Sequence, residues 1–388
     1  MPHITEVNDS VDAAAIAASA APAAEPAAVS APAPAAGDAE PRRARLAGPE
    51  IVQLPPDPDT DDDDEPDSKP EGEARDDDFL ATYPADTEEL HLQHLRLHNS
   101  SLLPLRLPRF GKSLRRLCLR QNELSSPLPG EVFEGLDALD ELDLYDNRLG
   151  PRVGDDELGG VKNVTSLDLS FNNIRHVPSL PSLTAVKILY LVQNKITKVE
   201  PGALDWCADT ITSIELGGNR LRAIEDLDKL VHLEELWLGK NKIRTLQNLD
   251  TFSSLKILSI QSNRITKMEG LEGLVNLEEL YLSHNGLMKI EGLEKNTKLR
   301  TLDVGNNEIE EIENISHLKD LEEFWASGNK IANLLPALDT QLAVLPNLET
   351  VYLEGNPCQT NDRAGYRRKV MLALPQVKQI DATFVKTG

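Results

Sequence analysis

The sequence has few cysteines and few aromatic residues. Aromatic side chains make up 4% of the 388 residues, and the three cysteines are Cys118, Cys207 and Cys358. An odd number of cysteines, at spacings that match no zinc motif, argues against a disulfide framework and against a structural zinc site. We therefore expect reduced thiols, as in a nuclear or cytoplasmic protein.

Long hydrophobic runs are also missing. No stretch approaches the roughly 18 uninterrupted apolar residues that predict a membrane span. The N-terminus has no basic segment followed by an apolar core, so we expect no signal peptide. Three glycosylation-type triplets begin at Asn99, Asn163 and Asn314. Because no secretory signal is present, we interpret them as chance matches.

The chain has far fewer basic than acidic residues, and its formal net charge is −24. A nucleic-acid-binding protein needs a basic face for phosphates, and an anionic membrane surface attracts basic segments. The composition therefore predicts neither kind of partner. A protein partner with basic patches fits the charge better, mainly through faster association.

What the sequence does contain is one pattern, L-x-x-L-x-L-x-x-N-x-[IL], repeated eleven times between Leu114 and Asn356. Repeats of this kind predict a leucine-rich-repeat solenoid. We expect an α/β array of about 12 repeats with a curved parallel sheet on its concave face and short helices or 3₁₀ turns on its convex face. The asparagine positions are Asn122, Asn147, Asn172, Asn194, Asn219, Asn241, Asn263, Asn285, Asn307, Asn329 and Asn356. These side chains should satisfy backbone groups of adjacent turns and have no chemical role.

Composition divides the chain into four parts. Residues 1–80 combine an Ala/Pro-rich stretch with an acidic one and are expected to be disordered. Residues 81–113 read as a degenerate first repeat that caps the array, 114–358 hold the repeats, and 359–388 form a C-terminal cap. The cap should use Tyr366, Val370, Leu372 and Leu374 to cover the end of the core. The acidic run at 61–65 lacks the Gly and Glu positions of a calcium-binding loop.

Function is predicted to lie on the concave face. Strand alternation sends the residue between the two leucines of each L-x-L outward. Five of these eleven residues are aromatic, far more than the 4% aromatic content of the chain would place there. Large side chains could simply shield the sheet, but aromatic residues are enriched at binding hot spots. We therefore predict a protein-binding face made by Cys118, Asp143, Asp168, Tyr190, Glu215, Trp237, Ser259, Tyr281, Asp303, Trp325 and Tyr352.

No constellation predicts catalysis or a cofactor. The sequence has no glycine-rich phosphate loop, nucleophile elbow or zinc-protease motif. His91, His94 and His98 lie close in sequence, but they lack Cys or Asp partners at ligand spacing. We expect no enzyme activity, no metal and no cofactor.

Several segments resemble the leucine-rich-repeat regulatory subunit of protein phosphatase 1, the regulatory subunit 7 family. They are residues 236–243 (LWLGKNKI), 280–286 (LYLSHNG), 323–325 (EFW), 366–375 (YRRKVMLALP) and 379–385 (QIDATFV). The resemblance covers about residues 85–386. In that family the concave face binds the phosphatase catalytic subunit. By matching repeats, the resemblance implies contacts at Asp168, Tyr190, Glu215, Trp237, Asp303, Glu323, Trp325 and Tyr352, and Tyr281 joins them from the geometry of the column.

The sequence thus predicts a non-enzymatic subunit, monomeric by itself, that controls the activity, maturation or localisation of protein phosphatase 1 in the nucleus and the cytoplasm. The resemblance also implies that a further phosphatase inhibitor protein can join the complex. The alternative is a leucine-rich-repeat scaffold for another assembly, of the tubulin-folding, axonemal or ribonucleoprotein type.

Overall fold

The computed structural model describes residues 79–385. Contacts divide the chain into two units, Met1–Pro70 and Glu71–Gly388, and the described residues belong to the second. The predicted arm at residues 1–80 lies outside the described range except for its last two residues. Among the described residues, no helix is long and apolar enough to cross a membrane.

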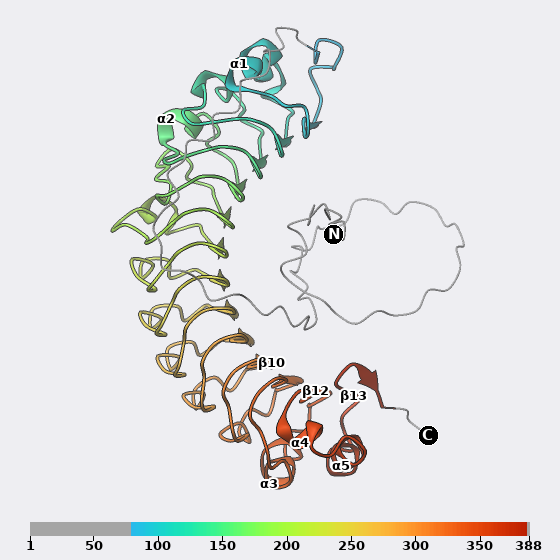
Figure 1. Ribbon diagram of the computed structural model, residues 1–388. Helices are drawn as coiled ribbons and strands as arrows, with labels where there is room; N and C mark the ends of the chain where they lie inside the picture. Colours follow the sequence, from blue (N-terminus) through green and yellow to red (C-terminus); the bar gives the residue numbers. More distant parts are fainter. Residues whose placement is uncertain (1–78, 386–388) are drawn as a thin grey trace, which may run out of the picture. The chain divides into compact units, whose positions relative to one another are not determined.

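A single sheet runs through the described residues, and its strands follow the order of the sequence. Each strand from β1 to β12 pairs in parallel with the next, whereas β13 and β14 are antiparallel. The predicted leucine-rich-repeat solenoid is confirmed, and its strands line the inner side of the curved array (Figure 1). The strands are β1 Glu89–His91, β2 Arg116–Cys118, β3 Glu141–Asp143, β4 Ser166–Asp168, β5 Ile188–Tyr190, β6 Ser213–Glu215, β7 Glu235–Trp237, β8 Ile257–Ser259, β9 Glu279–Tyr281, β10 Thr301–Asp303, β11 Glu323–Trp325, β12 Thr350–Tyr352, β13 Gln379–Ile380 and β14 Thr383–Phe384.

The strands form where the repeat pattern places an apolar residue between two outward-facing ones. In β7, for example, Leu236 is fully buried, while Glu235 and Trp237 on either side are half-buried. Leu238 and Ile243 of the same repeat are also buried, at 1% and 0% exposure. Every repeat contributes such residues, so the apolar core runs the length of the array instead of closing into one globule.

Helices occur on the convex side only where a repeat is long. Repeats whose asparagines are 25 or 27 residues apart contain a helical segment, and those spaced by 22 residues contain only turns. The repeat that contains residues 265–277 is one of the short ones. There the Leu274 N–H donates to Leu271 and the Leu277 N–H donates to Leu274, so the return consists of two separate three-residue turns and no helix continues. The helical segments of these long repeats are η4 Gly130–Val132, α2 Asp155–Leu158, η5 Asp205–Cys207, α3 Leu335–Ala337 and the π-helical turn η6 Leu338–Leu342.

The remaining helices belong to the two ends of the array. At the N-terminal end these are α1 Asn99–Leu102, η2 Leu103–Leu105 and η3 Leu107–Phe110, and at the C-terminal end α4 Pro357–Thr360 and α5 Tyr366–Ala373. In α5, Tyr366 and Val370 are buried, as predicted for a cap, and Leu374 just after it is buried too. Leu372 is 74% exposed, so its predicted role in the cap is wrong. It lies two positions from Val370, on the opposite side of the helix.

A row of asparagines, all buried except the half-buried Asn263 and Asn285, joins the repeats, and we refer to the eleven pattern asparagines as the asparagine ladder. In Asn241, Oδ1 accepts the Leu221 N–H at 2.9 Å, while Nδ2 donates to the carbonyls of Leu216 at 2.9 Å and Leu238 at 3.1 Å. The other ten asparagines make the same two kinds of bond, to the preceding repeat and to their own. The predicted structural role of these asparagines is confirmed.

The residue before each ladder asparagine adopts a left-handed conformation, with φ between +52° and +74° in all eleven repeats. This conformation costs roughly 1–2 kcal/mol for a residue with a Cβ atom. Gly218, Gly328 and Gly355 avoid that cost, whereas Phe171 does not. The turn geometry is therefore imposed by the ladder and not by the local residue type.

The ladder predicts a specific loss of stability. Asn241→Ala should reduce the free energy of unfolding by roughly 1–3 kcal/mol, because it leaves buried backbone groups without partners. Urea unfolding followed by circular dichroism measures the change. Asn276→Ala is the matched control, since the Asn276 side chain makes only exposed bonds: it donates to the Ser253 carbonyl and accepts from Lys298 Nζ. An equal loss in both variants would contradict the role assigned to the ladder.

Candidate functional site

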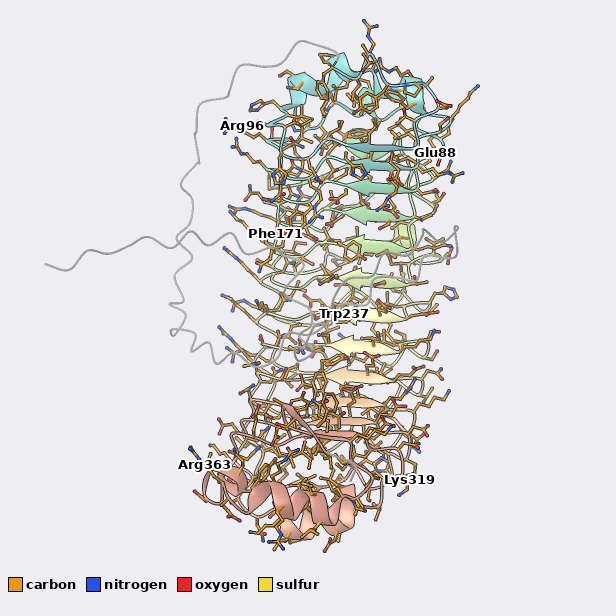
Figure 2. All side chains as sticks on the ribbon, turned by 90° about the vertical axis from the view of Figure 1, so that its right-hand side faces the viewer. Glu88, Arg96, Phe171, Trp237, Lys319 and Arg363 are labelled. Carbon is orange, nitrogen blue, oxygen red and sulfur yellow. The ribbon has the colours of Figure 1, made fainter. Side chains whose placement is uncertain are left out.

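The predicted column occupies the last residue of each strand from β2 to β12. Strand pairing places these residues in register, so that Trp237 lies beside Ser259, Ser259 beside Tyr281 and Tyr281 beside Asp303. Figure 2 views this face, with Trp237 near its middle. The column is therefore a continuous strip along the concave surface.

Four aromatic side chains of this strip touch one another, and we call them the aromatic row: Trp237, Tyr281, Trp325 and Tyr352. The ring centroids of Trp237 and Tyr281 are 6.5 Å apart, those of Tyr281 and Trp325 6.2 Å, and those of Trp325 and Tyr352 5.9 Å. These distances are typical of favourable ring contacts. The rings shield one another, so none is fully exposed, and Tyr281 is only 7% exposed.

The residues between the rings explain how they meet. Ser259 and Asp303 lie on strands between those of the row and are 3% and 6% exposed. Rings two strands apart, roughly 9.6 Å at the usual strand spacing, can approach because these small residues lie beneath them. The Asp303 carboxylate accepts the Gly305 N–H at 2.9 Å and Gln261 Nε2 at 3.3 Å. Burial raises its pKa.

Glutamates at the start of alternate strands hold the rings. The Tyr281 hydroxyl donates to Glu279 at 2.7 Å, and Trp237 Nε1 donates to Glu235 at 3.4 Å. On β11, Glu323 stands in the same place relative to Trp325. Burial raises the pKa of Glu323, and Glu279 raises it further. The row thus combines apolar rings with a flanking line of carboxylates.

Toward the N-terminal end the column becomes acidic. Asp168, Tyr190 and Glu215 end the neighbouring strands β4, β5 and β6. Burial and then Asp143 raise the pKa of Asp168 to about 6. Burial, followed by Asp168 and Glu235, raises the pKa of Glu215 to about 7. Burial and then Glu215 raise the pKa of Tyr190 to about 12. We call Asp143, Asp168, Glu215 and Glu235 the acidic group; its members repel one another and would be relieved by an incoming cation.

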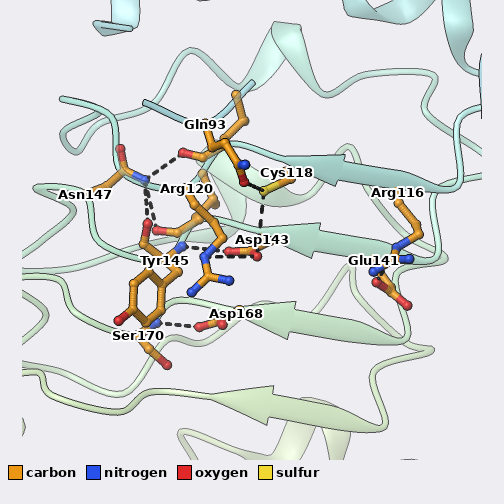
Figure 3. Close-up of polar contacts among 12 residues, drawn as sticks. Gln93, Arg116, Cys118, Arg120, Glu141, Asp143, Tyr145, Asn147, Asp168 and Ser170 are labelled. Atoms are coloured by element: carbon orange, nitrogen blue, oxygen red, sulfur yellow. Dashed lines mark hydrogen bonds and ion pairs between the residues drawn. The ribbon is translucent and has the colours of Figure 1, made fainter. Parts of the chain in front are cut away.

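A cluster that the sequence did not reveal lies next to the acidic group (Figure 3). The Arg120 guanidinium lies 4.1 Å from the Tyr145 ring centroid, and its Nε is 3.5 Å from an Asp143 oxygen. The ring centroids of Tyr145 and Phe171 are 4.8 Å apart. Arg120 and Tyr145 both lie two positions beyond the column, a periodic position at which the sequence could have been searched. Nothing in the sequence predicted the positive φ of Phe171, because phenylalanine does not favour that conformation.

The structure therefore divides the predicted site residues into two groups on one face. Asp168 and Glu215 belong to the acidic group, and Tyr190 lies on the strand between them. The aromatic row consists of Trp237, Tyr281, Trp325 and Tyr352. Glu323 flanks the row, and Asp303 lies beneath it. Within residues 79–385, no group of three or more His, Cys, Asp or Glu side chains is placed to hold a metal ion. The face offers hydrogen bonds, rings and charge to a partner surface.

Comparison with known proteins shows what the chain is similar to. A family model described as "Leucine Rich repeats (2 copies)" matches residues 253–295, 275–319 and 297–340, and one described as "Leucine Rich repeat" matches 162–175. A solved leucine-rich-repeat protein from Leptospira interrogans has a TM-score of 0.53 at 22% identity and covers 76% of this chain and 84% of its own. An internalin from Listeria monocytogenes has a TM-score of 0.57 at 21% identity, with coverages of 72% and 83%. At such low sequence identity, similarity to these two structures shows the fold alone.

Curated relatives are more specific. "Protein phosphatase 1 regulatory subunit SDS22" of Saccharomyces cerevisiae is 44% identical over 117 residues, which are 30% of this chain and 33% of the yeast protein. "Protein phosphatase 1 regulatory subunit 7" of Homo sapiens is 70% identical over 40 residues, 10% of this chain and 11% of the human protein. The chain is a leucine-rich-repeat protein related to the regulatory subunits of protein phosphatase 1. The resemblance found in the sequence is confirmed, although the aligned part spans a third or less of these relatives.

The acidic group predicts an unusual dependence of stability on pH. The pKa of Glu215 is about 7 in the folded protein, above the ordinary value of 4.5. The folded state therefore binds more protons than the unfolded state between these values, and the stability contributed by Glu215 falls as pH rises through this window. Glu215→Gln should make the protein more stable at pH 7.5, by on the order of 1 kcal/mol after solvent screening, with little effect at pH 4.5.

Urea unfolding of wild type and Glu215→Gln at the two pH values measures this difference. Glu272→Gln, on an exposed turn of the convex side, provides the isosteric control. If the stability of Glu215→Gln relative to wild type is the same at both pH values, Glu215 does not titrate in the window given above.

Proposed function

We propose that this protein is a non-enzymatic regulatory subunit that binds the catalytic subunit of protein phosphatase 1 through its concave face. The observation that carries the proposal is the aromatic row beside the acidic group on one strip of sheet. The names of the curated relatives support the choice of partner.

The strip has the properties of a binding hot spot. Tryptophan and tyrosine supply most of the binding free energy in many interfaces when they enter well-packed, desolvated contacts. Here Trp237 and Trp325 are half-buried by their neighbours, and Tyr281 is held by Glu279. Because the side chains are already ordered, little rotamer entropy is lost on binding.

Charge should fix the orientation of the partner. The acidic group favours lysine or arginine side chains on the opposing surface, and their approach would lower the raised pKa values of Asp168 and Glu215. Apolar side chains of the partner would then cover the aromatic row. The partner surface we expect is an apolar patch with basic residues at one end.

Binding should use the preformed face and not a docking peptide. The nearest match to a basic-Val-x-aromatic peptide is the segment Lys187–Tyr190. Its last three residues form β5, which pairs with β4 on one side and β6 on the other. The segment therefore cannot leave the sheet without breaking two sets of strand pairs.

The function we propose is control of the phosphatase's activity, maturation or localisation in the nucleus and the cytoplasm. A further phosphatase inhibitor protein could bind the same phosphatase while this protein, a monomer by itself, covers another surface. Regulation of this kind needs only a binding face, which agrees with a strip that combines rings and carboxylates.

Substitution of either tryptophan tests the face. Trp237→Ala and Trp325→Ala should each weaken binding of the phosphatase catalytic subunit by about 2 kcal/mol or more, because each removes a central ring of the row. Isothermal titration calorimetry with the full chain measures the affinity. The third tryptophan, Trp206, lies in η5 and donates to the Pro178 carbonyl at 3.1 Å, so Trp206→Ala is the control.

Circular dichroism and urea unfolding separate a binding defect from a folding defect in each variant. If the folded wild-type chain does not bind the phosphatase, the assignment fails, and a scaffold for another complex becomes the better explanation. If Trp206→Ala weakens binding as much as Trp325→Ala, the partner does not use the concave face.

A further inference from the structure

Arg120 is an unusual residue for its place on the concave face. It lies two positions beyond the column residue Cys118, and the equivalent positions of the other ten repeats hold no lysine or arginine. Six of those ten residues are glycine or serine, namely Ser170, Gly217, Gly239, Ser283, Gly305 and Ser327. A long cationic side chain where small residues predominate indicates a local role on this face.

Aromatic rings of the next two repeats hold the Arg120 side chain. Its guanidinium lies 4.1 Å from the Tyr145 ring centroid (Figure 3), and that centroid lies 4.8 Å from the Phe171 ring centroid. Phe171 joins the stack although its φ of +56° is unfavourable for a residue with a Cβ atom. A guanidinium stacked on a ring is restricted in position but keeps N–H groups available at its edge. The positive charge of Arg120 is therefore fixed in place.

This charge compensates the first carboxylate of the acidic group. The Arg120 Nε lies 3.5 Å from Asp143 Oδ2, and the two side chains are 36% and 28% exposed. Burial raises the pKa of Asp143, whereas the Tyr145 N–H group and the Arg120 charge lower it. Because the cation and the carboxylate are adjacent, the pair presents little net charge to a partner.

A second arginine pairs with the carboxylate at the other end of β3. Arg116 Nε lies 2.8 Å from Glu141 Oε2, and Arg116 Nη1 lies 3.8 Å from Glu89 Oε1 (Figure 3). Both carboxylates of β3, Glu141 and Asp143, therefore have an arginine from the preceding repeat beside them.

The later carboxylates of the acidic group differ in this respect. Among residues 79–385, no lysine or arginine lies at ion-pair distance from Asp168 or Glu215. Burial and then a neighbouring carboxylate raise the pKa of each, Asp143 acting on Asp168 and Asp168 acting on Glu215. The negative charge that is open to a partner therefore begins at β4 and not at β3.

We propose that Arg120 is a specificity-determining counter-ion: it neutralises Asp143 and thereby directs the basic side chains of the concave-face partner to Asp168 and Glu215. A partner cation placed over Asp143 would meet the Arg120 guanidinium at short range and be repelled. Built-in repulsion of this kind excludes a wrong register as effectively as attraction favours the right one. The inference rests on the proposed function, since the partner is the phosphatase catalytic subunit.

A double-mutant cycle on the full chain tests this role, with phosphatase affinity measured by isothermal titration calorimetry. Arg120→Gln should tighten binding by about two- to fivefold, because Asp143 becomes available to the partner's cations. Asp143→Asn leaves Arg120 uncompensated and should weaken binding by a similar factor. The double variant Arg120→Gln/Asp143→Asn should fall between the two single variants, since it has the same net charge as wild type. All these differences should shrink as salt is added.

The matched control is the Arg115–Asp140 pair, which joins the same two repeats at 3.0 Å. Arg115 lies five residues before Arg120, about 17 Å along an extended strand, which exceeds the Debye length of about 8 Å at physiological salt. Arg115→Gln and Asp140→Asn should therefore change the phosphatase affinity much less than the corresponding variants of the Arg120–Asp143 pair.

Weaker binding by Arg120→Gln would overturn the proposal, because it would mean that Arg120 contacts the partner directly or only supports the rings. Unchanged affinity across the cycle, or equal changes in the control pair, would overturn it as well. Wild type that binds the phosphatase with such a flat cycle leaves the proposed function intact, whereas wild type that does not bind removes both. Urea unfolding checks the fold of each variant, and Arg120→Met, which keeps apolar contact with Tyr145, replaces Arg120→Gln if that variant does not fold.

Discussion

The structure depends on the hydrogen bonds that each buried asparagine makes to two repeats at once. Asn241 accepts from Leu221 and donates to Leu216 in the preceding repeat, and it also donates to Leu238 in its own. These bonds fix where each strand ends and force the preceding residue to a positive φ, even where that residue is Phe171. Since every turn is fixed in the same way, the outward-facing residues of successive strands fall into columns. The concave strip is a consequence of this repetition.

Within the concave strip, chemistry follows the alternation of strands. Strands β7, β9 and β11 carry a glutamate and an aromatic residue, whereas β8 and β10 between them end in Ser259 and Asp303. The small residues leave room for rings two strands apart to touch, and the glutamates satisfy the polar atoms of two of those rings. If every strand ended in a large residue, neighbouring side chains would collide. If the rings did not touch, each ring would be more exposed to water. The alternation therefore yields a surface that is apolar, ordered and only partly shielded from water.

The repeat pattern was sufficient to predict the strands, the asparagine ladder and the column, because each depends on residues within one repeat or its neighbour. The helices were less predictable, since their presence depends on repeat length, and the 22-residue repeats close with turns alone. Contacts between rings could not be predicted, because they depend on the depth of Ser259 and Asp303 beneath the row. The cluster of Arg120, Tyr145 and Phe171 was missed because a left-handed phenylalanine breaks the local preference that sequence reasoning relies on. Leu372 was assigned to the cap from its hydrophobicity, whereas the turn of α5 directs it to solvent.

Charge is separated across this molecule in a way that net charge alone conceals. The acidic group lies on the concave face, where burial and mutual repulsion raise the pKa of Asp168 to about 6 and of Glu215 to about 7. Lys195 and Arg220, by contrast, lie just beyond the strand ends of repeats that also supply part of that face. A partner cation near Asp168 and Glu215 gains most when the carboxylates are ionised, so acidification should weaken that contact while leaving the partner's lysine or arginine charged. The binding of a basic surface to this end of the concave strip should therefore depend on pH.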